Sequence, residues 1–182
     1  MRVITGLAKG MRLETLEGMD VRPTADRVKE AEFSIIQFEI EGRRVLDLFA
    51  GSGALGIEAL SRGAKVATFV DANPEAVKVI RSNLEHTGLT KKASVAAGDF
   101  EQFLNYTKAA FDIVFIDPPY SKGLADRALQ LMVSHMSENG VIICEVAKID
   151  KLPEKSGDFT LARKSDYGKT SLYIYRKNIG MC

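Results

Sequence analysis

The chain has 182 residues, of which 46% are hydrophobic and 27% charged, and its formal net charge is +1. This length and composition indicate one globular domain with small additions. No apolar run approaches the ~18 residues of a membrane span, and the first residues have no secretory apolar segment. The two cysteines suggest neither a disulfide framework nor a metal site. We therefore expect a cytoplasmic, monomeric protein without membrane contact.

The charges are unevenly distributed along the chain. Residues 1–29 carry six basic and four acidic side chains, and residues 148–182 carry eight and four. Residues 30–147 carry eleven basic and sixteen acidic side chains. A basic surface built from both ends would attract a polyanion such as nucleic acid. The alternative is that the charges at both ends are simply solvated.

The amino-terminal part predicts a small extension. Residues 1–21 alternate basic, apolar and glycine positions, which predicts two short strands around a turn. Thr24 then predicts the start of a helix, because apolar residues recur at helical spacing over 28–36. The positive end of a helix dipole disfavours cations, yet three basic residues surround this start: Arg22, Arg27 and Lys29. They indicate an anionic partner or, alternatively, a solvated basic face.

A glycine turn organises the centre of the chain. An apolar run over 45–49 leads into this turn and then into a helix from Ala54, as in the first half of a nucleotide-binding β-α-β unit. Three glycines match the dinucleotide pattern Gly-x-Gly-x-x-Gly, a weak signal alone: Gly51, Gly53 and Gly56. They allow positive φ and a close approach of the backbone to a ligand.

The residues beside the turn favour one kind of ligand. In dinucleotide enzymes a pyrophosphate lies on the helix N-terminus. Here Asp47 offers a carboxylate and Phe49 an apolar wall, which suits a ligand with an ammonium group and no phosphate. S-adenosylmethionine is such a ligand. In the alternative interpretation, Asp47 caps the turn and Phe49 belongs to the core.

Three further apolar runs predict strands over 66–70, 93–96 and 111–116, with helices between them. Four strands with three intervening helices indicate a parallel, doubly wound sheet whose ligands bind at the carboxyl ends of the strands. An acid stands at or near each of these ends: Asp47, Asp71, Asp99 and Asp117.

Two of these acids have a specific expected partner. Asp71 lies 18 residues beyond Gly53, close to the ~20 expected for an acid that binds ribose hydroxyls. Asp99 either reaches an adenine amine or caps the next helix. Asp117 is followed by two prolines, which lock the loop after the strand over 111–116.

The carboxyl-terminal part predicts a helix over 124–136 and a strand over 141–146. Runs over 159–164 and 171–175 then flank a turn at 166–169 and predict an antiparallel pair. The expected fold class is thus α/β, with a doubly wound, mostly parallel sheet closed by an antiparallel edge. Such an edge is typical of methyltransferases and less typical of dehydrogenases.

Two motifs together resemble the S-adenosylmethionine-dependent amino-methyltransferases: Asp-Leu-Phe-Ala-Gly-Ser-Gly at 47–53 and Asp-Pro-Pro-Tyr at 117–120. Motifs along nearly the whole chain are similar to the RsmD family: Arg2-Val3-Ile4-x-Gly6, Lys9-Gly10, Arg22-Pro23-Thr24-x-Asp26-Arg27-Val28-Lys29-Glu30 and Tyr167-Gly168-x-Thr170. That family methylates the exocyclic 2-amino group of one guanine in small-subunit (16S) ribosomal RNA. The resemblance implies a Rossmann-like class I methyltransferase fold, S-adenosylmethionine as cofactor, and ribosomal RNA as partner, either free or in an assembled subunit.

The resemblance also assigns roles to residues. The expected catalytic residues are Asp117, Pro118, Pro119 and Tyr120. The expected cofactor-binding residues are Asp47, Phe49, Ala50, Gly51, Ser52, Gly53, Asp71, Ala72, Asp99 and Phe100. The expected RNA-binding residues are Lys9, Arg12, Arg22, Arg27, Lys29 and Tyr167. Residues 1–40 would form a hairpin-plus-helix extension that contacts RNA, and residues 41–182 the methyltransferase domain. No metal is expected.

The chemistry explains these residue types. The amine of guanine is a poor nucleophile because its lone pair is delocalised into the ring. Hydrogen bonds to the Asp117 carboxylate and the Pro118 carbonyl would localise this lone pair toward the methyl group, while Tyr120 stacks on the base. Positioning and preorganised electrostatics would then supply most of the acceleration. The base must leave its stack to reach such a pocket.

Departures from the family pattern and alternative functions remain. Asp71 stands where the family more often has glutamate, Glu32 and Ser34 replace an apolar residue and an asparagine, and the usual tryptophan near Gln37 is absent. The alternatives are methylation of DNA adenine or protein glutamine, a nucleotide-binding dehydrogenase, and a catalytically silent RNA-binding module. A dehydrogenase gives the Asp-Pro-Pro-Tyr motif no role, and a silent module predicts that the motif is broken.

Overall fold

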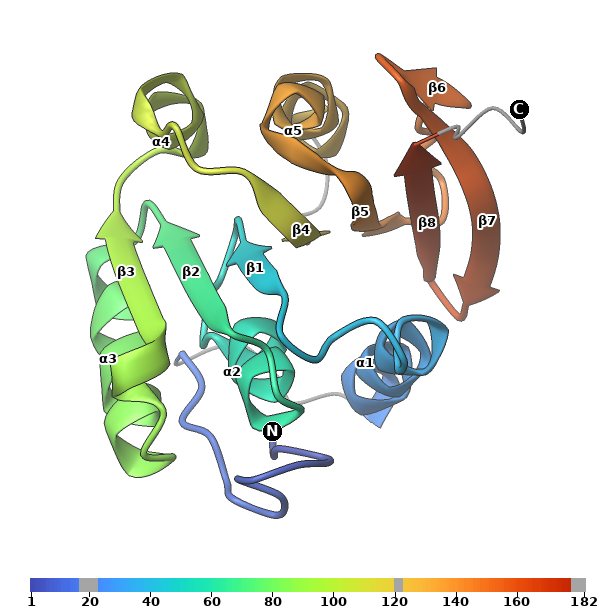
Figure 1. The fold of residues 1–182 in the computed structure, drawn as a ribbon. Helices are drawn as coiled ribbons and strands as arrows, with labels where there is room; N and C mark the ends of the chain where they lie inside the picture. The colour runs from blue at the N-terminus through green and yellow to red at the C-terminus, as the bar shows by residue number, and fades with distance from the viewer. Residues whose placement is uncertain (17–22, 120–122, 178–182) are drawn as a thin grey trace.

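The structure, a computed structural model, describes residues 1–16, 23–119 and 123–177. Its centre is an eight-stranded sheet in the order β3-β2-β1-β4-β5-β8-β7-β6 (Figure 1). The strands are β1 Arg44–Asp47, β2 Val66–Asp71, β3 Ala93–Ala97, β4 Phe111–Ile116, β5 Met136–Ala147, β6 Lys155–Ser156, β7 Phe159–Tyr167 and β8 Thr170–Lys177. The α-helices are α1 Pro23–Ile35, α2 Ala54–Ser61, α3 Pro74–His86, α4 Phe100–Tyr106 and α5 Leu124–Met132, and short 3₁₀ turns occupy Thr90–Lys92 and Val133–His135.

The sheet has a parallel part and an antiparallel edge. Strands β1 to β5 pair in parallel, whereas β8, β7 and β6 pair antiparallel. Helices α1, α2 and α3 cover one face of the sheet, and α4 and α5 cover the other (Figure 1). The central strands are buried on both faces, which explains why β4 is apolar almost throughout. This architecture confirms the predicted fold class.

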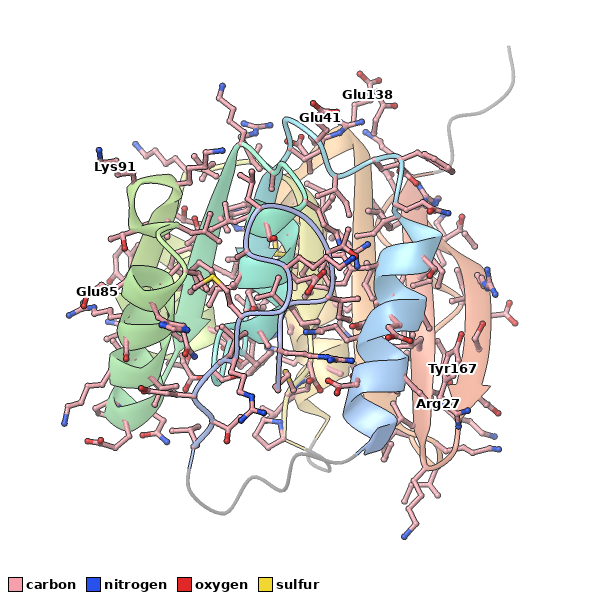
Figure 2. The ribbon with its side chains drawn as sticks, turned by 90° about the horizontal axis from the view of Figure 1, so that it is seen from below. Arg27, Glu41, Glu85, Lys91, Glu138 and Tyr167 are labelled. Atoms are coloured by element: carbon pink, nitrogen blue, oxygen red, sulfur yellow. The ribbon has the colours of Figure 1, made fainter. Side chains whose placement is uncertain are left out.

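Helix α1 is attached to the centre of the sheet. The ring of Phe33 packs against that of Phe115 in β4, with centroids 5.4 Å apart. The guanidinium of Arg62, the C-cap residue of α2, lies 4.6 Å from the centroid of the Phe33 ring. Figure 2 shows Arg27, near the start of α1, at the same edge of the molecule as Tyr167 and opposite Glu41. The start of α1 thus lies at the edge where the parallel strands end.

The amino-terminal segment forms a loop with a single antiparallel bridge, Arg2 to Arg12, where two short strands were expected. The pairing does not extend into longer strands, because the residues between Arg2 and Arg12 fold against α2. The Ser61 hydroxyl donates to the Thr5 carbonyl at 2.6 Å and accepts from the Ala8 amide at 3.0 Å. A Cβ on Gly6 would lie 1.8 Å from the Ser61 carbonyl oxygen, so only glycine allows this approach.

The predicted boundaries near α5 need correction. The helix expected over 124–136 ends at Met132 and continues as a 3₁₀ turn to His135. Strand β5 begins at Met136, five residues before the expected start, because an irregular stretch extends its pairing with β4. The short strand β6 was not predicted. Among the described helices, none is both long and apolar enough to cross a membrane.

Candidate active site at the carboxyl edge of the sheet

The glycine turn between β1 and α2 has the backbone that its sequence predicts. Gly51 has a φ of 54°, and Gly53, the N-cap of α2, has a φ of 78°. Space beside Gly51 is open, so a ligand can approach its backbone. Gly56 has a different function, since a Cβ there would lie 2.3 Å from the Phe69 ring. Its role is close packing of α2 on the sheet.

Asp47 is buried under this turn, with 2% of its surface exposed. Its Oδ2 accepts a 3.0 Å hydrogen bond from the Gly56 amide in the first turn of α2. Burial raises the pKa of Asp47 to about 7, the Gly56 bond opposes this, and the charge of Asp71 adds to it. Asp47 therefore does hold the turn, as the alternative interpretation proposed. The structure does not test its contact with a cofactor.

Asp71 ties the end of β2 to the glycine turn. Its Oδ2 accepts from the Gly51 amide at 2.8 Å and its Oδ1 accepts from the Asn73 amide at 2.8 Å. Asn73 in turn caps α3 by accepting from the Glu75 amide at 3.0 Å. A carboxylate has about four lone-pair positions, so Asp71 can also accept from ribose hydroxyls. Ala72 is exposed directly beside it.

Asp99 is the N-cap of α4. Its Oδ1 accepts from the Glu101 amide at 2.8 Å and the Gln102 amide at 3.3 Å. Asp99 therefore has one of its two predicted roles, that of capping the helix. A cavity of about 430 Å³ borders Asp99 and Gln102. The rings of Phe49 and Phe100 pack with centroids 5.0 Å apart, which gives the edge an apolar wall. A role for Asp99 in binding adenine stays a prediction.

Asp117 and Pro118 follow β4 directly, at the centre of the same edge. Asp117 is partly buried, and burial raises its pKa well above the ordinary value, with further contributions from the charges of Glu145 and Asp47. A cavity of about 120 Å³ lies beside Pro118 and Pro119 and is also bordered by Glu145. Tyr120, assigned to stacking on the base, lies outside the described residues.

Three residues that the sequence interpretation missed support this edge. Asn83 of α3 donates to the Ser52 carbonyl at 2.9 Å and pairs with the backbone of Glu14, which links the glycine turn to the amino-terminal segment. Glu32 of α1 is buried with 2% exposure, and Glu145 is partly buried at the end of β5. Glu145 interrupts an apolar strand, a signal that the sequence contains. Glu32 and Asn83 give no such signal, because their burial depends on how the helices pack.

The predicted RNA-contacting residues have different positions. Lys9, Arg12 and Arg27 are exposed, and Tyr167 is half-buried. Figure 2 shows Arg27 and Tyr167 at the same edge of the molecule, the edge where the parallel strands end. Arg22 lies outside the described residues.

Lys29 requires a correction. It is 3% exposed, its Nζ donates to the Arg2 carbonyl at 2.7 Å, and it lies 3.5 Å from the Glu58 carboxylate. Burial lowers its pKa, although the Glu58 charge opposes this. A side chain engaged in this way holds α1 against the amino-terminal segment and α2. It has no free surface for RNA.

Comparison with known proteins shows the family. The family model described as "Conserved hypothetical protein 95" matches residues 1–176. The chain belongs to this family. It is 42% identical over 182 residues to the Bacillus subtilis protein named "Putative rRNA methyltransferase YlbH", covering 97% of this chain and 99% of the relative. It is 35% identical to "Ribosomal RNA small subunit methyltransferase D" of Haemophilus influenzae, covering 97% and 93%.

A solved relative has the same fold. The structure titled "Putative methyltransferase yhhF from Escherichia coli" superposes with a TM-score of 0.85 at 31% identity and covers 97% of both chains. The resemblance to the RsmD family is thereby confirmed, and a dehydrogenase is excluded. Family and fold together confirm the prediction of an S-adenosylmethionine-dependent methyltransferase.

The residues of the edge fit this cofactor. The open turn at Gly51 admits a close backbone approach, and Asp71 presents carboxylate oxygens for ribose. The apolar wall of Phe49 and Phe100 lies beside them. Among the described side chains, no group of three or more histidine, cysteine, aspartate or glutamate residues could hold a metal ion.

Proposed function

We propose that the protein transfers a methyl group from S-adenosylmethionine to the exocyclic 2-amino group of a guanine in small-subunit (16S) ribosomal RNA. The observation that carries this proposal is the position of Asp117 and Pro118, which follow β4 beside the strand that leads into the glycine turn. The Haemophilus influenzae relative named for methylation of small-subunit ribosomal RNA supports the acceptor.

The chain's own groups have defined roles in this reaction. The cofactor supplies an electrophilic methyl group on a positively charged sulfur. The Asp117 carboxylate accepts an N–H of the guanine amine and the Pro118 carbonyl accepts the other, which localises the nitrogen lone pair toward the methyl group. The amine gains a positive charge on methylation, and its extra proton passes to an Asp117 oxygen. The rigid Pro118–Pro119 loop keeps these acceptors in place.

The extension would bring the RNA to this edge. We propose that residues 1–40 contact RNA through Lys9, Arg12, Arg22 and Arg27, together with Tyr167, and that residues 41–182 form the methyltransferase domain. Support comes from the exposure of Arg27, which lies at the same edge of the molecule as Tyr167. We place the reaction in the cytoplasm and propose that the enzyme acts as a monomer.

The test offers labelled S-adenosylmethionine with four acceptors in parallel: naked 16S ribosomal RNA, assembled small subunits, duplex DNA and a glutamine-containing protein substrate. The expected product, after digestion to nucleosides and chromatography, is N2-methylguanosine from one of the two RNA samples. Asp117→Ala serves as the inactive control. Label in adenine of DNA, or in protein, would replace the proposed acceptor by one of the alternatives.

A further inference from the structure

The glycine turn between β1 and α2 is held from two sides by side chains of other elements. On one side, the carboxylate of Asp71 in β2 accepts from the Gly51 amide at 2.8 Å. On the other side, Nδ2 of Asn83 in α3 donates to the Ser52 carbonyl at 2.9 Å. These bonds engage the amide of one turn residue and the carbonyl of the next, so together they fix the backbone that the cofactor approaches.

Asn83 also binds the amino-terminal segment, residues 1–16. Its Oδ1 accepts from the Glu14 amide at 2.8 Å, and its Nδ2 donates to the Glu14 carbonyl at 3.0 Å. The Asn83 side chain is 1% exposed, so water would not readily replace a partner that it loses. One side-chain amide, with both of its donors and its oxygen engaged, therefore joins the glycine turn to the end of the amino-terminal segment.

The backbone of Glu14 determines which way the Asn83 amide faces. The Glu14 N–H requires the amide oxygen, and the Glu14 carbonyl requires the amide nitrogen. With the amide turned over, its oxygen would face the Ser52 carbonyl, and two acceptors repel each other. If Glu14 leaves, the buried Oδ1 loses the hydrogen bond from its amide, and the bond to Ser52 loses the contact that orients it. The docking of Glu14 and the bond to Ser52 are thus linked through one side chain.

The same segment has a second attachment, at the far end of α2. The hydroxyl of Ser61, the last residue of α2, accepts from the Ala8 amide at 3.0 Å and donates to the Thr5 carbonyl at 2.6 Å. Ser61 is buried like Asn83, with 2% of its surface exposed. The length of α2, about 12 Å at 1.5 Å per residue, separates Ser61 from the glycine turn. The two attachments thus have similar chemistry, and of the two only that of Asn83 includes a bond to the turn.

We propose that Asn83 is a positioning residue for S-adenosylmethionine and that it couples the docking of the amino-terminal segment to cofactor binding. Docked Glu14 holds the Asn83 amide toward Ser52, and this bond keeps the glycine turn in the form that binds the cofactor. Thermodynamic linkage makes the effect reciprocal, so bound cofactor favours the docked state of Glu14 by the same factor. The segment thereby supports cofactor binding without touching the cofactor. This inference rests on the cofactor alone and holds whichever acceptor is methylated.

The first test uses the wild-type protein with no acceptor present. Amide hydrogen exchange is measured residue by residue, by NMR, with and without saturating S-adenosylmethionine. The Glu14 amide should exchange about three- to tenfold more slowly with the cofactor bound, the factor that one net hydrogen bond supplies. The Ala8 amide, which donates to Ser61, is the internal control and should show no comparable slowing. A Glu14 amide that slows no more than the Ala8 amide would overturn the proposal.

The second test compares two variants by calorimetric titration with S-adenosylmethionine. Asn83→Ala removes the side chain that joins Glu14 to Ser52, and its affinity should fall about three- to tenfold. Ser61→Ala is the matched control, because it removes an equally buried attachment of the same segment, and it should keep the wild-type affinity. Thermal melts of the same preparations report the stability that each variant has lost. Wild-type affinity in Asn83→Ala, or an equal loss in both variants, would exclude a specific positioning role for Asn83.

Hydrogen exchange in the two variants separates positioning from a general loss of stability. In Ser61→Ala, the cofactor should still slow exchange at Glu14, although the segment has lost a bond elsewhere. In Asn83→Ala, the Glu14 amide should exchange quickly, and the cofactor should not change its rate. Slowing at Glu14 that survives in Asn83→Ala would show that the coupling passes through another contact, which would overturn the role of Asn83. If Asn83→Ala does not fold, the comparison of Glu14 with Ala8 in the wild-type protein still decides, and failure of the guanine assignment alone leaves all these results unchanged.

Discussion

Oδ2 of Asp71 accepts a 2.8 Å hydrogen bond from the amide of Gly51, 20 residues earlier in the chain. The acid at the end of β2 thus holds the turn that follows β1. A residue expected to bind ribose therefore also shapes the loop against which the rest of the cofactor lies. Removal of the Asp71 side chain would therefore remove the expected acceptor for the ribose hydroxyls and also loosen the backbone of the glycine turn.

The first prediction concerns Asp71. Asp71→Ala should weaken binding of S-adenosylmethionine by ~1.5–3 kcal/mol, roughly 10- to 150-fold, because hydrogen bonds to charged groups contribute about this much. Calorimetric titration of the folded variant measures it. Glu75→Ala is the control, since Glu75 is exposed in the first turn of α3 and its carboxylate pairs with Lys78 at 2.7 Å on the surface. A wild-type dissociation constant for Asp71→Ala would leave Asp71 with only its role in the turn.

The second prediction separates chemistry from binding. Asp117→Ala should slow methyl transfer by about 100-fold or more while cofactor affinity changes little, because Asp117 faces the accepting amine. Single-turnover kinetics with prebound cofactor measure the two steps separately. Asp112→Ala is the matched control on β4, where Asp112 pairs with Arg44 at 3.2 Å at the opposite end of the strand. More than about a tenth of the wild-type rate in Asp117→Ala would contradict the role.

The third prediction concerns pH. Asp117 must be ionised to accept the amine protons, and burial followed by the Glu145 charge raises its pKa. The transfer rate should therefore rise with pH as Asp117 loses its proton. Glu145→Gln removes a nearby negative charge, which lowers the Asp117 pKa and moves the rising limb to lower pH. Asp47, with a pKa of about 7, titrates in both proteins, so it does not produce the difference. If the rise of the transfer rate in Glu145→Gln occurred at the wild-type pH or at a higher pH, the charge of Glu145 would not control the pKa of Asp117.

Strands β1, β2 and β4 could be predicted because each is a short apolar run that ends in an acid or is followed directly by one. The turn at Gly51 and Gly53 was predictable for a local reason, since only a few residues tolerate its backbone. The start of β5 at Met136 was not, because the residues that extend its pairing with β4 have no apolar pattern. Local sequence therefore predicts elements better than boundaries that depend on a neighbouring strand.

The residues that were misassigned or missed from the sequence are positioned by contacts between parts of the chain that lie far apart in the sequence. Lys29 resembles a basic residue on a helix start until Glu58, 29 residues later, is seen beside it. Glu32 belongs to a helix of weak amphipathic pattern and becomes buried only because Phe33 meets Phe115. Neither partner can be identified from one sequence. Charged residues near a predicted helix start thus need the fold before they can be assigned to a ligand.

The fourth prediction follows from the corrected position of Lys29. Lys29→Ala should lower the free energy of unfolding by about 3–5 kcal/mol, the cost of breaking a buried ion pair. It should not change the salt dependence of RNA binding, because its Nζ is engaged with Arg2 and Glu58. Urea denaturation measures the first quantity and RNA titration the second. Wild-type stability together with a lower salt slope would restore the earlier assignment of Lys29 to RNA.

The last prediction concerns Arg27, which is exposed at the same edge of the molecule as Tyr167 (Figure 2). If Arg27 meets an RNA phosphate, Arg27→Gln should weaken RNA binding and reduce the slope of log K against log salt by ~0.7–0.9, the release of about one counterion. Cofactor affinity should not change. Lys91→Gln is the matched control, because Lys91 is an exposed cation at the opposite edge of the sheet and should leave the slope as it is (Figure 2). Filter binding over a range of salt concentrations gives the slope, and thermal melts of the same preparations report stability. The competing explanation is that Arg27 pairs internally with Asp26 or Glu30, in which case Arg27→Gln lowers the melting temperature and keeps the wild-type slope. Since the two explanations move different quantities, one preparation of each variant decides between them.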